Sequence, residues 1–244
     1  MPPALFISDL HLAPARPVLV GAFHAFCQGP ARAAAALYVL GDLFDAWIGD
    51  DALREPMAAG VAASLRAVAA GGTPVGLMRG NRDLLLGARF AAAAGATLLP
   101  DQVVVDAGGV PTLLLHGDEL CTGDDAYQRF RAWAHDPVRQ RRFLALPYFA
   151  RRAVIAWMRR RSGQETAAKT EAVMDVSPDA VAEALRTHGV GRMIHGHTHR
   201  PAHHDLVVDG RRCERWVLPD WYDRASYLEV DAAGARLLEV AAPR

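Results

Sequence analysis

Five short apolar runs in this 244-residue chain each end abruptly at a cluster of polar residues. Runs of this length that stop at polar or glycine residues are typical of buried strands. They cover residues 5–8, 37–40, 75–78, 112–115 and 193–194. Alanine-rich segments with helical spacing, at 18–28 and 56–70, separate the first three runs. Strands that alternate with helices predict a layered α/β architecture.

The pattern changes after residue 200, where short apolar segments follow one another without intervening helices. They lie at 206–208, 215–218, 226–230 and 236–240, with Asp-Gly and Ala-Gly turns between them. Such turns commonly join antiparallel strands. We therefore expect a second, mostly antiparallel sheet packed beside the first.

The polar clusters carry the chemistry of a metal site. Because ligands of open α/β sheets bind outside the carboxyl ends of the strands, clusters that follow five strands are expected to converge. Their carboxylates, imidazoles and amide oxygen suit hard or borderline cations. Seven candidate ligands are too many for one metal and fit two, particularly if one carboxylate bridges. The candidates are Asp9, His11, Asp42, Asn81, His116, His197 and His199.

Each cluster taken alone has an ordinary structural explanation. A Gly-Asp pair is usually a turn, and a single histidine at a strand end is more often a hydrogen-bonded structural residue. Gly196-His197-Thr198-His199 is more specific, because alternate residues of extended chain project to one side. Packing alone does not explain five such clusters in this order. The role of His195 stays open between a structural part and support of a ligand, and we expect Asp118 to orient a ligand.

Residues 124–175 differ from the rest of the chain in charge and composition. Between Arg129 and Lys169 there are eleven basic residues and only two acidic ones, a net charge of +9 in a chain whose total is zero. The same segment has helical spacing and many aromatic and aliphatic side chains. We expect a basic, apolar helical insertion within an acidic domain formed by residues 1–123 and 176–244.

The insertion allows several interpretations. It can be a solvated helical hairpin whose apolar face packs on the domain, with its arginines simply exposed. Its apolar residues can also line a chamber for acyl chains, and arginines around apolar side chains suit an anionic membrane surface. Arginine interleaved with aromatic residues can grip single-stranded nucleic acid, but residues 143–150 are too apolar for a groove that follows a nucleic-acid backbone.

The remaining composition narrows the class of protein. Three cysteines without a CxxC pair favour a reducing compartment over a disulfide framework. The first residues lack the basic and long apolar regions of a signal peptide. The chain contains no stretch of about 18 uncharged apolar residues, so the sequence predicts no membrane-spanning helix.

The order of the clusters resembles that of the calcineurin-like metallophosphoesterases: Asp-x-His, Gly-Asp, Gly-Asn-x-Asp, His and Gly-His-x-His, from residue 9 to 199. The resemblance implies a four-layer αββα sandwich with a binuclear site. It places Asp9, His11 and His199 on one metal, Asn81, His116 and His197 on the other, and Asp42 between them. Most members have histidine where this chain has Arg82. Arginine does not donate its proton at neutral pH, but it clamps phosphate oxygens, which favours a phosphate leaving group.

Longer runs resemble a narrower family, the UDP-2,3-diacylglucosamine pyrophosphatases of lipid A biosynthesis. They are residues 41–51, 80–83, 116–122 and 194–201, and the resemblance continues through the insertion. It implies two Mn²⁺ per chain and in-line attack on the α-phosphorus by a hydroxide held between them. The products would be UMP and 2,3-diacylglucosamine 1-phosphate. It also implies a peripheral position on the cytoplasmic face of the inner membrane, without a nucleic-acid partner or an obligate protein partner.

The same resemblance implies a set of substrate contacts. Asn81 and Arg82 are expected to act in catalysis and, with His197, to bind the substrate. The insertion would add four further contacts to the sugar and nucleotide: Asp124, Ser162, Thr166 and Lys169. Two alternatives remain open, a phosphodiesterase or nuclease on the same fold, and a non-catalytic scaffold. The presence of all seven ligands disfavours the scaffold.

Overall fold

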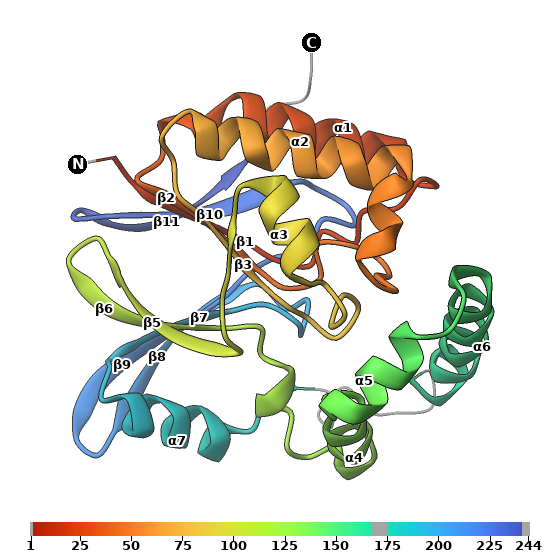
Figure 1. Cartoon of the computed structure of the whole chain (residues 1–244). Coiled ribbons are helices and arrows are strands. Elements are labelled where there is room, and N and C mark those ends of the chain that lie inside the picture. The colour runs from red at the N-terminus through yellow and green to blue at the C-terminus, as the bar shows by residue number, and fades with distance from the viewer. Residues whose placement is uncertain (1, 167–174, 241–244) are drawn as a thin grey trace.

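The computed structural model describes residues 2–166 and 175–240, without the side chains of residues 159–166. Two β-sheets lie face to face, and helices cover the outer face of each sheet (Figure 1). The expected four-layer αββα sandwich is therefore confirmed. Three further helices project beside the layers, on the side where the strands β1, β2 and β3 end (Figure 1).

The first sheet has six strands, and its centre is parallel. β1, β2 and β3 pair in parallel, and β10 and β11 extend the sheet by antiparallel pairing on the β1 side. Its order is β11 (Gly234–Glu239), β10 (Ser226–Asp231), β1 (Ala4–Ile7), β2 (Ala36–Leu40), β3 (Val75–Met78) and β4 (Thr97–Leu98). Three of the predicted strands, β1, β2 and β3, thus place the polar clusters that follow them along one edge of this sheet.

The second sheet has five strands, and it corrects one expectation. Its order is β5 (Gln102–Ala107), β6 (Val110–Leu115), β7 (Arg192–His195), β9 (Arg211–Val217) and β8 (Ala202–Val208). The prediction that the four strands after residue 200 form one sheet of their own is wrong. The β8–β9 hairpin joins β7, while β10 pairs with β1 because the buried faces of β10 and β1 share the core between the sheets.

Helices cover both outer faces. α1 (Pro17–Gln28), α2 (Pro56–Ala70) and α3 (Ala88–Ala94) lie on the first sheet, and α7 (Pro178–His188) lies on the second. Proline at the first helical turn favours the start of α1, α2 and α7. Short 3₁₀ turns complete the domain at η1 (Pro30–Ala33), η2 (Asp50–Arg54) and η3 (Asp118–Leu120).

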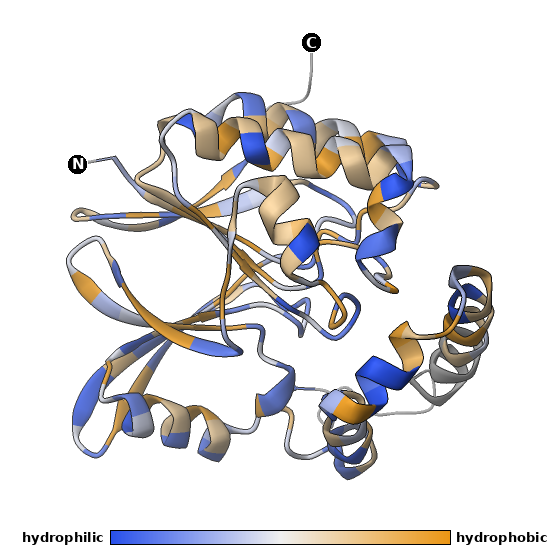
Figure 2. Ribbon diagram, in the orientation of Figure 1, coloured by the Kyte–Doolittle hydropathy of each residue, from blue (hydrophilic) through white to orange (hydrophobic). Residues whose placement is uncertain are grey.

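Among the described residues, three separate cores hold the layers together, which explains why the central strands of the first sheet, β1, β2 and β3, lack charged residues. Phe23 and Leu65 pack between the helices and the first sheet. Leu114 and Ile194 pack between the two sheets, whereas Leu113, the neighbour of Leu114, faces the core beneath α7. Successive residues of a strand point to opposite faces, so a strand covered on both sides needs no polar alternation. Figure 2 shows this as strands that are predominantly hydrophobic between the layers.

The segment expected to form a helical insertion is helical where it is described. It contains α4 (Asp125–Ala134), α5 (Pro137–Leu144) and α6 (Tyr148–Thr166), which mix hydrophobic and hydrophilic residues (Figure 2). Asp124 and Asp136 cap α4 and α5 by accepting backbone N–H groups. The exact limits of the insertion stay a prediction. Among the described residues no helix combines the length and apolarity needed to cross a membrane.

A substitution in the core between the sheets tests this architecture. Leu114 is fully buried, so Leu114→Ala removes packing on both facing sheets and should lower the free energy of unfolding by about 2–5 kcal/mol. Val207→Ala is the control, because Val207 is 73% exposed, and it should change stability by less than about 0.5 kcal/mol. Equal effects of the two substitutions in urea unfolding would contradict the layer assignment.

Candidate metal centre

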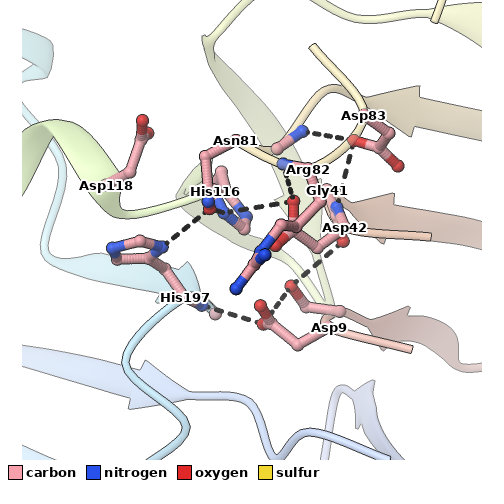
Figure 3. A network of polar contacts seen from close by, with 12 residues as sticks. Asp9, Gly41, Asp42, Asn81, Arg82, Asp83, His116, Asp118 and His197 are labelled. Atoms are coloured by element: carbon pink, nitrogen blue, oxygen red, sulfur yellow. Dashed lines mark hydrogen bonds and ion pairs between the residues drawn. The ribbon is translucent and has the colours of Figure 1, made fainter. Parts of the chain in front are cut away.

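All seven predicted ligands lie at the carboxyl ends of five strands, where the two sheets meet. Asp9 and His11 follow β1, Asp42 follows β2 and Asn81 follows β3; His116 follows β6, and His197 and His199 follow β7. Figure 3 shows five of them, Asp9, Asp42, Asn81, His116 and His197, turned toward one another from both sheets. The expected convergence is confirmed, although it joins two sheets rather than one.

The backbone adopts an unusual conformation at most of these ligands. Six residues other than glycine have positive φ among those described, and five of them are ligand candidates: Asp9, His11, Asp42, His197 and His199, at 48–68°. Left-handed backbone costs free energy for a residue with a Cβ, and it clusters at functional sites where the surrounding structure enforces it. The chain is therefore held in strained turns that aim these side chains at one point.

The first ligand group combines Asp9 with two histidines. His11 Nε2 lies 3.2 Å from His199 Nε2, and His199 Nε2 lies 3.3 Å from Asp9 Oδ1. The candidate ligand atoms of these three residues all lie within 4.8 Å of one another. This is the set that the resemblance assigns to one metal.

The second group gathers around Asn81. Asn81 Oδ1 lies 3.1 Å from His116 Nε2 and 3.2 Å from His197 Nδ1. Asp42 faces both groups, since its two carboxylate oxygens lie 3.8 Å from His116 Nε2 and 3.9 Å from His11 Nδ1. Asp9 also comes within 4.8 Å of Asp42 and His116, so the two groups adjoin. The expected bridging position of Asp42 agrees with this geometry.

Glycine is required where backbone and ligand approach closely. A Cβ on Gly80 would collide with Asp42 Oδ1, and a Cβ on Gly196 would collide with Asp9 Oδ2. Gly80 and Gly196 thus permit backbone to pass against the two buried carboxylates.

The unpaired polar atoms of the site fit divalent cations. Asp9 Oδ1 and His11 Nδ1 are buried without a hydrogen-bond partner among the described residues. Burying such atoms without a partner costs free energy, so an additional group is expected to contact them. Carboxylate, imidazole and amide-oxygen donors match Mn²⁺, Zn²⁺ or Fe²⁺ rather than a soft metal.

Burial and mutual charge shift the pKa values of the ligands. Burial raises the pKa of Asp42 to about 8. Burial would lower the pKa of His116, but the Asp42 and Asp9 carboxylates raise it to about 9. Despite its burial, His199 is raised to a pKa of about 10 by Asp220 and Asp9. The negative charge of the carboxylates thus raises the pKa of both histidines, and the same charge would favour a bound cation, which would displace the histidine protons.

Three supporting residues escaped the sequence analysis. Asp83 accepts the backbone N–H groups of Asp42, Leu43, Phe44 and Gly80 and so fixes the turn that carries Asp42 (Figure 3). Ser8 Oγ donates to Asp9 Oδ2 at 2.6 Å. Asp220 lies 3.2 Å from His199 Nδ1, opposite the nitrogen that faces Asp9. Asp83 stands in a recognised cluster, but Asp220 is far from all five in sequence and carries no local signal.

The hydrogen-bond partners of His195 and Asp118 indicate what each residue does. Burial lowers the pKa of His195 to about 3, so its ring is neutral; Nδ1 donates to Gly196 O and Nε2 accepts from Arg215. His195 is therefore a structural residue behind the ligand loop. His116 Nδ1 donates to Leu40 O, whereas Asp118 accepts from Tyr127 and Arg131 of α4. The expectation that Asp118 orients a ligand is not borne out for His116; Asp118 fastens α4 instead.

The predicted substrate contacts are described only in part. Arg82 is exposed beside the metal ligands, its backbone N–H donates to Asp42 Oδ1, and its charge helps to lower the pKa of His11 (Figure 3). Asp124 is buried and caps α4. Ser162 and Thr166 fall in α6 where side chains are not described, and Lys169 lies outside the described residues. These contacts stay predictions.

The fold and the paired ligand groups define a metallophosphoesterase. A family model described as calcineurin-like phosphoesterase matches residues 2–201, and the chain belongs to this family.

Bacterial relatives match almost the whole chain. A protein of Aromatoleum aromaticum named UDP-2,3-diacylglucosamine hydrolase is 52% identical over 95% of this chain and 94% of its own. Proteins with the same name are 49% identical in Pseudomonas paraeruginosa, over 95% and 96% of the two chains, and 50% identical in Xanthomonas axonopodis pv. citri, over 97% and 98%.

The contact between Asp220 and His199 predicts an effect on metal affinity. Asp220→Asn removes the carboxylate that orients the His199 ring and should weaken divalent-metal binding by about 10–100-fold. Asp223→Asn removes a nearby exposed carboxylate and should leave the affinity unchanged. Calorimetric titration of both variants with Mn²⁺ measures the difference, and an unaltered affinity in Asp220→Asn would refute the role.

Proposed function

We propose that this protein hydrolyses the pyrophosphate bond of UDP-2,3-diacylglucosamine to UMP and 2,3-diacylglucosamine 1-phosphate. The observation that carries the proposal is a two-group metal site beside an exposed arginine, next to a helical insertion with apolar side chains. The relatives named UDP-2,3-diacylglucosamine hydrolase support the substrate, because they share about half of their residues over nearly the full chain.

Two divalent cations, for which we propose Mn²⁺, would polarise the phosphoryl oxygens and lower the pKa of a water between them. Asp9, His11 and His199 would hold one cation, Asn81, His116 and His197 the other, with Asp42 shared. The water would lose one proton to solvent, its oxygen would form a bond to the α-phosphorus, the bond from this phosphorus to the bridging oxygen would break, and the sugar 1-phosphate would leave with the electron pair of that bond.

Arg82 places its positive charge where negative charge develops on the leaving phosphate. Its guanidinium can form bidentate hydrogen bonds to phosphate oxygens. A departing phosphate needs little protonation, so the family's histidine acid is dispensable for a pyrophosphate. Asn81 holds its position beside Arg82 with its oxygen toward His116 and His197, which leaves its amide nitrogen for the substrate.

The insertion would receive the acyl chains. Eight of the fourteen large hydrophobic side chains exposed in the described residues lie between positions 130 and 157. The insertion is fastened at two places: Arg131 of α4 pairs with Asp118 and Glu119, and the buried Arg151, near the start of α6, pairs with Asp51 and donates to Ile48 O. A fixed frame with apolar residues between its anchors suits two acyl chains beside the metal groups. The same frame argues against a solvated hairpin that only packs on the domain.

We further propose that the insertion touches the cytoplasmic face of the inner membrane as a peripheral contact. Phe149, Ala153 and Trp157 lie on one exposed face of α6, four residues apart. The neighbouring helix α5 carries exposed arginines at 139, 141 and 142, and α6 carries one at 152. Each basic residue near an anionic surface contributes about 1 kcal/mol to binding.

Substrate ranking tests the proposed activity. With Mn²⁺, the protein should release UMP from UDP-2,3-diacylglucosamine and hydrolyse bis-(p-nitrophenyl) phosphate poorly. The opposite ranking would favour a general phosphodiesterase or nuclease, and no metal-dependent hydrolysis of any phosphoester would favour a scaffold.

Asp42→Ala should lower kcat by roughly 10²-fold or more, because both metal groups lose a shared carboxylate. Circular dichroism of this variant should match the wild type.

Vesicle binding tests the membrane contact. Phe149 is 76% exposed, and Phe149→Asp should reduce co-sedimentation with vesicles of anionic phospholipid. Val207→Asp places the same charge at a similarly exposed site on β8 and should bind as the wild type does. Binding that is insensitive to Phe149→Asp and to salt would contradict the proposal.

A further inference from the structure

Three consecutive residues between β9 and β10 each touch a metal-ligand residue. Asp220 contacts His199, the Trp221 backbone N–H donates to Asp9 O at 3.2 Å, and the Tyr222 ring lies 5.2 Å from the His11 ring. Trp221 is fully buried, and its indole donates to Ser226 O, so the segment is fixed in place. The segment lies beyond the residues 2–201 that match the family model.

Arg16 packs against the Tyr222 ring of this segment. Its guanidinium carbon lies 4.3 Å from the centre of the Tyr222 ring, which in turn stacks at 24° against His11. Arg16 occupies the N-cap position of α1, but its side chain makes no capping hydrogen bond. A cation over an aromatic ring is held in orientation without use of its N–H donors.

The donors of Arg16 are left without acceptors in the part of the chain that is described. Arg16 Nη1 is buried and has no hydrogen-bond partner there, and no carboxylate of the described residues pairs with this guanidinium. A buried N–H without an acceptor is unfavourable in a folded protein. An oriented guanidinium with free donors next to a phosphoester site is suited to a phosphate oxygen.

The position of Arg16 indicates which half of a pyrophosphate it meets. The insertion approaches the other side of the ligand set, where the Tyr127 ring of α4 lies 5.9 Å from the His197 ring. Arg82 follows Asn81, whose oxygen faces His116 and His197, and because its charge also acts on His11, Arg82 borders both ligand groups. Arg16 and Tyr222 instead border His11 and His199. A substrate whose lipid half lies along the insertion therefore directs its nucleotide half toward Arg16.

Resting on the activity proposed above, we infer that Arg16, oriented by Tyr222, binds the phosphoryl group of the nucleoside monophosphate half of the substrate. The two arginines then divide the pyrophosphate: Arg82 contacts the phosphate that leaves with the sugar, and Arg16 contacts the phosphate that stays with the nucleoside. Tyr222 is a positioning residue, because it acts through Arg16. The pair would make the site selective for nucleotide-linked substrates.

Product binding tests this division directly. Calorimetric titration of Mn²⁺-loaded Arg16→Gln with UMP should show a dissociation constant raised by about tenfold or more, as expected for one lost charge-assisted hydrogen bond. The inhibition constant of UMP in turnover should rise in parallel, while that of 2,3-diacylglucosamine 1-phosphate stays within about twofold. Arg16→Lys should recover part of the UMP affinity. Tyr222→Phe should bind UMP normally, whereas Tyr222→Leu should weaken it.

Arg66→Gln is the matched control, because Arg66 is an exposed arginine on α2 away from the ligands. The melting temperature of each variant is compared with that of the wild type. If Arg16→Gln or Tyr222→Leu is destabilised, the UMP affinities of the conservative variants Arg16→Lys and Tyr222→Phe decide the test. An unchanged UMP affinity in Arg16→Gln, equal weakening of both products, or a wild type that turns over the substrate without binding UMP would overturn the inference. A wild type that neither binds UMP nor hydrolyses the UDP-linked lipid would instead overturn the proposed function itself.

Discussion

The site depends on two buried carboxylates, Asp9 and Asp42. A glycine lies so close to each carboxylate that no side chain would fit at the glycine's position. Gly80 approaches Asp42 and Gly196 approaches Asp9, and the glycines come from different sheets. Gly80 and Asp42 both follow strands of the first sheet, whereas Gly196 follows β7 of the second sheet and meets Asp9 of the first, so the Gly196–Asp9 contact holds the two sheets close together at the strand ends. Burial alone would protonate Asp42, whose pKa is raised to about 8. Bound cations relieve that cost, so the fold and the metal chemistry are expected to depend on each other.

Around this contact the two sides of the site are built differently. One side is held by ion pairs and hydrogen bonds to the insertion, through Asp118, Arg131 and Arg151. The other side is formed by the short segment that the buried Trp221 anchors. The Tyr222 ring of this segment packs against the Arg16 guanidinium. An amphiphilic substrate with a lipid half and a nucleotide half matches a site with exposed apolar side chains on the insertion and the Arg16 guanidinium on the other side. In the proposed function, the candidate metal ligands between them would act on the bond that joins the halves.

The sequence predicts which residues meet at the strand ends because strand-end motifs are local: each apolar run positions the residues that follow it. Helices α1 and α2 were predictable for the same reason. The pairing of β10 with β1 was not, because Asp-Gly and Ala-Gly turns indicate hairpins but not the sheet that receives them. Asp220 and Arg16 were missed because their roles arise from contacts across the fold, His199 being 21 residues from Asp220 in sequence. The positive φ of the ligand residues likewise follows from the surrounding structure rather than from residue type.

The central claim is that water attacks the phosphorus on the nucleotide side of the pyrophosphate. Hydrolysis in ¹⁸O-labelled water, followed by ³¹P spectroscopy of the products, measures this directly. The label should enter UMP, and 2,3-diacylglucosamine 1-phosphate should remain unlabelled. Label in the sugar 1-phosphate, or in both products, would contradict it.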